Sequence, residues 1–213
     1  MFYRKIGYPL VFASFFAAAS GCGSNDSTAS KSQNVVEAQS FVVAANGLSF
    51  QISKNSRLST AEMDYEGYKT ILVNISAAQG EPESEIWVTS FPCEYSSSSK
   101  GEFQKVILGE AQKLLTDALA NGGFKIGTSA DFAIQPVPKT SDNYSIYGYY
   151  FDFVRTYHAD RAERLVVLGD YLNDSQKCIR IKAGSQKSIM INPTTLLGKT
   201  LIDVQSSVHF THN

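Results

Sequence analysis

An Asn46-Gly47 dipeptide between two alternating apolar and polar runs predicts a β-hairpin over residues 40–52. Both residue types tolerate the positive φ angles that a type I′ turn requires at its two central positions. The turn fixes the register, and in that register the apolar side chains all fall on one face. The opposed pairs are Ala45 with Leu48, Val43 with Phe50, and Phe41 with Ile52. The hairpin is therefore expected to cover a core on one side only.

Further apolar and β-branched runs, bounded by turn residues, predict six more strands. Two of them precede the first helical pattern, and four follow it. The expected strands are 70–75, 85–91, 132–137, 144–157, 164–172 and 177–183. The last four are separated by short polar turns near 139–143, 158–161 and 173–176, so they are expected to pair as an antiparallel meander.

Helical spacing predicts a long amphipathic helix over residues 99–121. Ser99 and Glu102 form a capping-box pair at its start, and Gly122 follows its end. A second helix is expected to begin at Asn192, as N-cap, with Pro193 in the first helical position. The tail 208–210 is expected to return as a short strand.

The N-terminal segment 1–21 has the three parts of a secretory signal peptide: a basic start, an apolar stretch and small residues. The small residues Ala19, Ser20 and Gly21 stand directly before Cys22. This run resembles the lipobox of bacterial lipoproteins, and the resemblance implies cleavage before Cys22 and lipid attachment to its thiol. The alternative is ordinary cleavage after Ala19 or a similar residue, which would release a soluble periplasmic protein.

A lipidated Cys22 would hold the protein on a membrane without any further contact. By the same resemblance, Gly23 in place of aspartate after the cysteine implies the outer membrane, with the protein facing the periplasm. Residues 22–39 are expected to form the lipidated flexible tether, because residues 23–33 contain one apolar side chain, Ala29. The sequence contains no run of 18 predominantly apolar residues, so no membrane-spanning helix is predicted.

The order of the expected elements is a hairpin, two strands, a helix, four strands and a terminal helix. This order predicts an α+β fold, with a largely antiparallel twisted sheet, one long central helix and one C-terminal helix packed on it. It resembles the PsbP-like fold, which extrinsic photosystem proteins share with several small bacterial lipoproteins. The resemblance covers residues 40–210 and implies no functional residue. Since no second linker interrupts it, residues 40–213 are expected to form one domain.

If Cys22 carries lipid, Cys93 and Cys178 remain as two thiols in an oxidising compartment. Cys93 follows an expected strand and Cys178 begins one. We therefore expect a structural disulfide between them. The alternative is a redox or metal site, which would need a CxxC pair or neighbouring histidine ligands, and the sequence around each cysteine has neither.

Catalytic signatures are sparse in this sequence. It has no GxSxG, phosphate-binding loop, dinucleotide fingerprint or HExxH, and its histidines are His158, His209 and His212. A hydrolase would need a serine such as Ser96 or Ser129 to approach His158. With 19 basic against 20 acidic residues, there is no electrostatic case for nucleic acid. We expect no catalytic residue, metal or cofactor.

The expected strand 144–157 carries an aromatic file on one face, formed by Tyr147, Tyr149, Phe151, Phe153 and Tyr157. The other face is also largely apolar, so we expect a central strand covered on both sides. One interpretation of the file is core packing. The other is an apolar cleft or a docking surface, with Tyr147 and Tyr149 as anchors for a partner.

The leading functional hypothesis is a non-enzymatic lipoprotein that binds a protein partner in the cell envelope. The partner could be an assembly component, or a toxin that the chain inhibits as an immunity protein. Acidic loops are further candidate contacts: Glu81, Glu83 and Glu85 in one, Asp170 and Asp174 in the other. Asp170 and Asp174 lack the spacing and glycine of an EF-hand loop, so a polar hairpin turn is preferred there. A lipid or small-molecule binder is the second hypothesis, and a hydrolase is the third.

Overall fold

The computed structural model describes residues 40–93, 99–121, 123–125, 134–138, 145–155, 161–172, 176–186 and 193–211. These residues form eleven strands and two helices, and many more of them lie in strands than in helices. All strand pairs in the two sheets are antiparallel. Among the described residues, neither helix is long and apolar enough to cross a bilayer.

The smaller sheet contains β1 (Ser40–Ala45), β2 (Leu48–Ser53) and β11 (His209–Phe210), in the order β1-β2-β11. The predicted hairpin register is confirmed, from Phe41 opposite Ile52 to Ala45 opposite Leu48. Its turn has φ angles of 55° at Asn46 and 75° at Gly47, as a type I′ turn requires. The predicted terminal strand is confirmed as well, since β11 pairs with β2.

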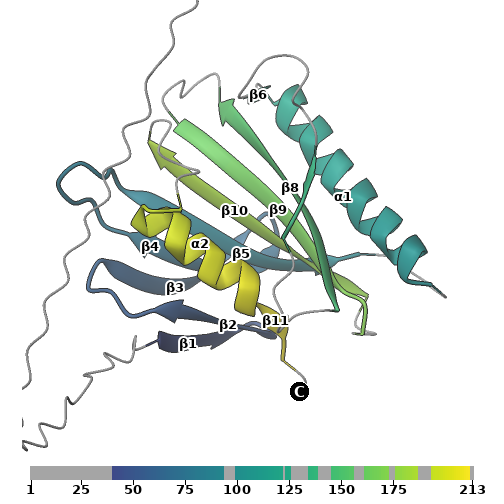
Figure 1. Ribbon diagram of the computed structural model, residues 1–213, viewed down its shortest axis with the longest axis horizontal. Helices are drawn as coiled ribbons and strands as arrows, with labels where there is room; N and C mark the ends of the chain where they lie inside the picture. Colours follow the sequence, from purple (N-terminus) through teal and green to yellow (C-terminus); the bar gives the residue numbers. More distant parts are fainter. Residues whose placement is uncertain are drawn as a thin grey trace, which may run out of the picture. The chain divides into compact units, whose positions relative to one another are not determined.

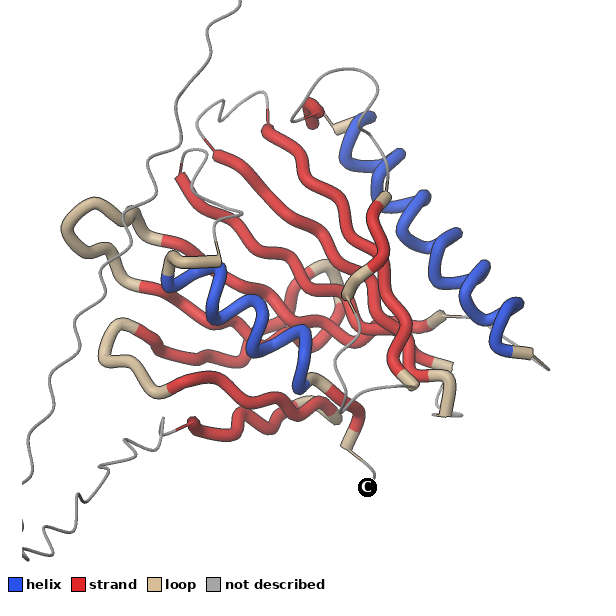
Figure 2. Tube along the Cα trace, in the orientation of Figure 1, coloured by secondary structure: helices blue, strands red, loops and turns tan. Residues whose placement is uncertain are grey.

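The larger sheet has eight strands, and Figures 1 and 2 show the smaller sheet below it in the view. Its main path runs β3-β4-β5-β10-β9-β8-β6, with β7 also paired to β8. The bounds are β3 (Leu58–Tyr65), β4 (Tyr68–Ile75), β5 (Ser84–Pro92), β6 (Gly123–Lys125), β7 (Gln135–Pro136), β8 (Ile146–Arg155), β9 (Arg161–Asp170) and β10 (Lys177–Gln186).

The predicted meander is confirmed, because β7 pairs with β8, β8 with β9, and β9 with β10. Two details differ from the prediction. The strand expected over 132–137 is only the two-residue β7, and residues 132–133 lie outside the described part. The expected turns at 139–143 and 173–175 lie outside it too, while Arg161 belongs to β9 rather than to a turn.

Strand β3 was not predicted from the sequence. It pairs with β4 along its whole length, from Leu58 opposite Ile75 to Tyr65 opposite Tyr68. The connecting turn holds Glu66 at φ 51° and Gly67 at φ 79°, so it has the same two-residue geometry as the first hairpin. Glutamate is uncommon at a positive φ angle, which is why Glu66-Gly67 gave no clear hairpin signal.

Helix α1 (Lys100–Ala120) is the long helix that the sequence predicted. The side chain of Ser99 caps it by accepting a hydrogen bond from the Glu102 backbone N–H at 3.3 Å. The helix packs on β8 and β9, and the contact is close at Gly169. A Cβ on Gly169 would lie 2.3 Å from Ile107 Cδ1, so only glycine lets α1 approach the sheet this closely.

Gly109, also in α1, is not required by close packing. A Cβ built at Gly109 has no neighbouring atom within 4 Å, and its φ angle is ordinary for a helix. Gly109→Ala is therefore expected to raise the free energy of unfolding by about 0.5–1 kcal/mol, because alanine loses less backbone entropy in a helix. Urea denaturation measures the change. Gly169→Ala is the matched control and should destabilise the protein, and equal effects of the two variants would contradict the packing described for α1.

Helix α2 (Leu196–Ser207) begins later than the sequence predicted. Its N-cap is Thr195, whose hydroxyl accepts a hydrogen bond from the Gly198 N–H at 3.1 Å, so the prediction of an N-cap at position 192 was wrong. Threonine is itself a favoured N-cap, and Pro193 lies in the turn before it. The helix then packs against β2.

Side-chain alternation along the central strands separates two cores. Val166 and Leu168 of β9 face the cluster that contains α2 and the small sheet, whereas Val167 faces the cluster that contains α1. The two helices therefore cover opposite faces of the eight-stranded sheet. The even-numbered face of β8 is covered only in part, since Ile146 is buried but Asp152 forms an ion pair with Arg164 at 2.8 Å.

The predicted disulfide between Cys93 and Cys178 is present. Their Cα atoms lie 5.3 Å apart, within the usual range for a disulfide, and both residues are buried. Cys93 follows the last residue of β5, and Cys178 is the second residue of β10. Because β5 and β10 are paired, the bridge joins two neighbouring strands at one end of the sheet.

Candidate functional site

Helix α1 covers only part of its face of the larger sheet. The main contacts of α1 are with β8, β9 and β6, so on the same face β3, β4 and much of β5 and β10 lie beyond it. The register places Leu72, Trp87 and Lys182 in one row across three neighbouring strands. We define the open face by its main residues, which are Ala61, Met63, Tyr65, Leu72, Trp87, Arg180 and Lys182. Apart from the exposed Ala61, these side chains are half-buried.

An aromatic pair lies at the centre of the open face. The ring centroids of Tyr65 and Trp87 are 4.7 Å apart, with their planes tilted by 56°. Lys182 Nζ lies 5.7 Å from each centroid, close enough for a cation–π contact with both rings. The indole Nε1 of Trp87 is buried and has no hydrogen-bond acceptor among the described residues. The pair therefore combines an apolar surface with a neighbouring cation.

Ion pairs hold the two cations of the open face in place. Arg180 lies 2.9 Å from a carboxylate oxygen of Glu66, at the tip of the β3–β4 hairpin. Lys182 lies 3.8 Å from Glu163, whose side chain is only 2% exposed. Beside these groups, a hollow of about 220 Å³ separates the sheet from the C-terminal half of α1. Its lining is mixed in charge, with Glu66 and Asp117 facing Arg180 and Lys182.

The pKa of Glu66 is lowered from its ordinary value. Burial acts in the opposite direction and is the largest single influence, but hydrogen bonds from Tyr65 and Arg180 and the charges of Arg180 and Lys182 together outweigh it. The lowered pKa means that the ionised carboxylate stabilises the folded state. That contribution is fully present above the unfolded pKa and disappears as the pH falls through the folded pKa.

Arg180→Gln is expected to raise the pKa of Glu66 toward the ordinary value, because it removes the cation and leaves the burial. Carbon-13 NMR titration of the Glu66 carboxyl group measures this directly. Lys69→Gln is the control, since Lys69 pairs with Asp64 on the exposed side of the same hairpin. An unchanged Glu66 titration in Arg180→Gln would contradict the ion pair described here.

A second hollow of about 370 Å³ lies at the far end of the open face. Hydroxyl, amide and carboxylate groups dominate its lining, and the Ser84 hydroxyl donates to the Ser185 hydroxyl at 3.1 Å. The lining residues are Ser59, Asn74, Ile75, Ser76, Glu83, Ser84, Glu85, Gly184 and Ser185. The structure thus brings Glu83 and Glu85, two of the acids predicted as partner contacts, to the rim of this polar hollow.

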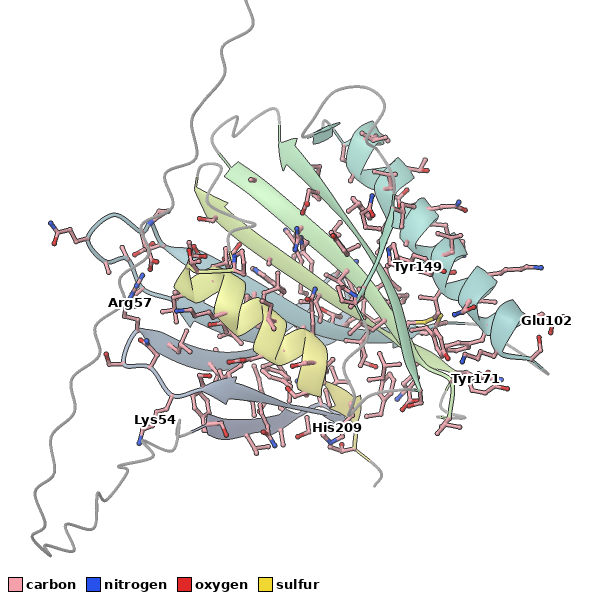
Figure 3. All side chains as sticks on the ribbon, viewed as in Figure 1. Lys54, Arg57, Glu102, Tyr149, Tyr171 and His209 are labelled. Atoms are coloured by element: carbon pink, nitrogen blue, oxygen red, sulfur yellow. A yellow bond between two sulfur atoms is a disulfide. The ribbon has the colours of Figure 1, made fainter. Side chains whose placement is uncertain are left out.

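Glu81, the third acid of that loop, is held in an ion pair. Its carboxylate lies 2.5 Å from Arg57, and Arg57 Nε also donates to the Ser76 carbonyl at 2.8 Å. The hydrogen bond from Arg57 lowers the pKa of Glu81. Figure 3 shows Arg57 beside the connection between β2 and β3. Glu81 therefore ties the β4–β5 loop to the start of β3.

The two acidic segments predicted as partner contacts do not meet. Glu85 is opposite Gly184, and Gly184 is opposite Glu163, whereas Asp170 lies seven residues further along β9. At about 3.3 Å per residue, this places the segments roughly 23 Å apart along the strands. Asp170 accepts a hydrogen bond from the Leu172 N–H at 3.1 Å, which fits the predicted polar turn, and Asp174 lies outside the described residues.

Of the aromatic file, Tyr147 and Tyr149 were the predicted docking anchors. Tyr147 is only 6% exposed, and its ring lies 6.0 Å from that of Phe103 in α1. Tyr149 is half-buried and lies between β8 and α1 (Figure 3). Core packing, the first of the two interpretations, therefore describes this end of the file, and Tyr157 lies outside the described residues.

No group of three or more His, Cys, Asp or Glu side chains among the described residues is arranged to hold a metal ion. His209 is exposed next to the Ser207 carbonyl, which it approaches at 2.9 Å through Nδ1. Ser96, Ser129 and His158, the residues that a hydrolase would need, lie outside the described part of the chain.

Two comparisons with known proteins found no match. No protein-family model matches it. No curated protein matches it either. Neither comparison therefore assigns a ligand or a partner to the open face.

Proposed function

We propose that this chain is a lipid-anchored, non-enzymatic protein of the bacterial envelope and that it binds a protein partner through the open face. The observation that carries the proposal is the aromatic pair Tyr65–Trp87, which lies on a sheet face that α1 leaves uncovered. Tyrosine and tryptophan are over-represented among the residues that dominate protein interfaces.

The polar groups around the pair favour a protein over a lipid as the ligand. The two cations and the rim acids Glu83 and Glu85 offer directional contacts that a hydrocarbon chain cannot satisfy. A protein surface supplies carbonyl groups and charged side chains for all of them. An assembly component and a toxin neutralised by an immunity protein both fit this description.

The anchor and the fold class belong to the same proposal. Cys22 is the proposed site of lipid attachment, residues 22–39 the tether, and the periplasmic side of the outer membrane the location. We assign the domain to the α+β class and to the PsbP-like type. The tether would let the open face search for its partner while the protein stays at the membrane.

A second candidate is a small-molecule binder, and the polar hollow favours it. A volume of about 370 Å³ is within the range of small-molecule sites. Its hydroxyl, amide and carboxylate lining would select a polar, hydrogen-bonding ligand rather than an apolar lipid. Its position at the end of the open face means that a protein partner could also insert a polar side chain there.

Site-specific photo-crosslinking in cells tests the protein-binding proposal. A photoreactive phenylalanine analogue replaces Met63 on the open face, or Lys105 on the exposed side of α1 as the control. The expected result is one predominant protein adduct from position 63 and none from position 105. Adducts of equal abundance from both positions, or no protein adduct from position 63, would overturn the assignment of the open face.

The anchor is tested separately with Cys22→Ser. The variant is expected to lose incorporation of radioactive palmitate and to leave the membrane fraction. Cys93→Ala serves as the control, because it removes a different cysteine and should leave labelling intact. Wild-type protein without label, or a Cys22→Ser variant that stays in membranes, would contradict the anchor and leave the open-face proposal standing.

A further inference from the structure

Strand β3 forms one edge of the eight-stranded sheet, and no described strand pairs with its outer side. It is eight residues long, contains no proline, and is exposed over most of its length. Natural proteins usually protect such edges from pairing with strands of other chains. On the small sheet this protection is visible, because Asp203 and Ser207 of α2 accept hydrogen bonds from the backbone of β2 at Ser53 and Gln51. On β3 the described residues provide nothing equivalent.

The register identifies the backbone groups on the outer side of β3. A two-residue turn is closed by a hydrogen-bonded pair, here Tyr65 and Tyr68. Hydrogen-bonded and non-hydrogen-bonded pairs then alternate along an antiparallel ladder, so Met63 and Ala61 also bond to β4. The N–H and C=O groups of Thr60, Glu62 and Asp64 therefore point outward, away from β4.

Side chains along the edge differ between the two faces of β3. Glu62 lies on one face with an exposed carboxylate that has no ion-pair partner among the described residues. Its neighbour Asp64 pairs with Lys69 at 2.9 Å, but this pair is exposed, and such pairs contribute little. On the other face, Ala61 continues the apolar row of Leu72 and Trp87, and Met63 lies beside it, opposite Thr70.

We propose that the outer edge of β3 binds an extended segment of the partner protein by β-strand addition, and that this segment alternates basic and apolar residues. The basic side chains would lie opposite Glu62 and Asp64, and the apolar ones beside Ala61 and Met63. Backbone hydrogen bonds to Thr60, Glu62 and Asp64 would supply affinity, and the alternation would set the register. This inference rests on the proposed protein-binding function and specifies the partner's contact segment.

A second copy of this chain is a poor occupant of the same edge. Antiparallel pairing of two β3 strands centred on Glu62 or Met63 would place an acid of one strand opposite an acid of the other. Like charges directly opposite each other destabilise a strand pair. The same acids attract a basic segment, so the charge pattern selects against self-pairing and for a basic partner.

Peptide binding to the full-length chain tests the proposal. The probes are three heptapeptides with acetylated and amidated ends. One alternates lysine and valine, one alternates glutamate and valine, and the third, the block peptide, has four lysines followed by three valines. Fluorescence anisotropy measures affinity, and NMR measures amide protection. The alternating lysine peptide is expected to bind best and to protect the amides of Thr60, Glu62 and Asp64. Equal binding of the block peptide, or protection elsewhere, would overturn the proposal.

Proline substitutions separate backbone pairing from side-chain attraction. Thr60→Pro removes an outward N–H, which an edge strand tolerates, and retains both acids. It is expected to weaken binding of the alternating lysine peptide by about tenfold or more while the fold persists. Ala61→Pro is the matched control, because it removes a bond to β4 and should destabilise the hairpin itself. Unchanged binding by a folded Thr60→Pro variant would exclude strand addition.

A charge reversal provides a second test that does not depend on proline. Glu62→Lys is expected to weaken binding of the alternating lysine peptide by about fivefold and to strengthen that of the alternating glutamate peptide. Glu102→Lys makes the same change on α1 and should leave both affinities unchanged. If Glu102→Lys has the same effect as Glu62→Lys, net charge rather than the β3 edge governs binding, and the proposal fails.

Failure of this inference can be told apart from failure of the proposed function. Suppose that crosslinking at position 63 captures a partner, and that the yield of the adduct is the same when the protein also carries Thr60→Pro. The open face then binds protein without strand addition at β3. If no partner is captured in cells, the protein-binding function fails whatever the peptides do. A dimer in sedimentation that Thr60→Pro abolishes would identify a second copy as the occupant and overturn the inference.

Discussion

Replacing Cys93 and Cys178 together with alanine is expected to lower the free energy of unfolding by roughly 4.5 kcal/mol. The two cysteines lie 85 residues apart in the sequence, so the bridge restricts a long loop in the unfolded chain. The loop contains α1, the aromatic strand β8 and all of β9. Both side chains are buried, and alanine avoids leaving an unsatisfied polar group in their place.

Urea denaturation of the oxidised wild type, the reduced wild type and the double variant measures this effect. Reduced wild type and double variant should have similar midpoints, both well below that of the oxidised protein. A double variant with wild-type stability would contradict a structural role for the bridge.

Phe103→Ala is expected to lower the free energy of unfolding by about 3–5 kcal/mol, the usual range for truncation of a buried phenylalanine. The side chain is 0% exposed, and its ring makes edge contacts with Tyr147 at 6.0 Å and Tyr171 at 5.6 Å. It also lies directly over Gly169, where α1 comes closest to the sheet. The truncation would therefore open a cavity at the contact that holds α1 in place.

Two matched substitutions show whether the loss comes from packing. Phe103→Leu keeps most of the apolar volume and should cost less than half as much as Phe103→Ala. Lys105→Ala changes an exposed residue of the same helix and should have little effect. Near-UV circular dichroism should report the altered packing of Tyr147 and Tyr171. A small effect of Phe103→Ala would mean that α1 is only loosely attached to the sheet.

Local sequence signals predicted the parts of this fold that depend on neighbouring residues. Asn46-Gly47 determined both the turn and the register of the first hairpin, since a two-residue turn leaves one way to oppose Phe41 and Ile52. Ser99 predicted the start of α1, because a hydroxyl at that position satisfies an otherwise unpaired N–H. The disulfide was predicted because Cys93 and Cys178 lie at strand ends.

The strand that was not predicted and the wrong start of α2 have physical causes as well. Strand β3 contributes almost nothing to the core, so its sequence carries no strong apolar signal, and pairing with β4 decides its conformation. At α2, the sequence predicted Asn192 as the cap, whereas Thr195 caps the helix and the residues that follow it pack against β2. Tertiary contacts settled both cases.

Only part of the candidate site could be predicted from the sequence. Glu83 and Glu85 were predicted as contacts from their density in a loop. The pairing of Tyr65 with Trp87 joins β3 to β5 across β4, and it requires the strand order, which no local pattern encodes. The signal that could have revealed it is the alternation of Ala61, Met63 and Tyr65 before Glu66-Gly67.

The pairing of β11 with β2 affects how the chain can mature. Groups of β2 and α2 that bond to each other lie 156 residues apart in sequence, so the small sheet stays incomplete until residues 207–210 have been synthesised. Such distant pairing slows folding and prolongs exposure of apolar strands. Chains that end prematurely before residue 196 would keep an unprotected β2, and they should be prone to aggregation and to degradation by quality-control proteases.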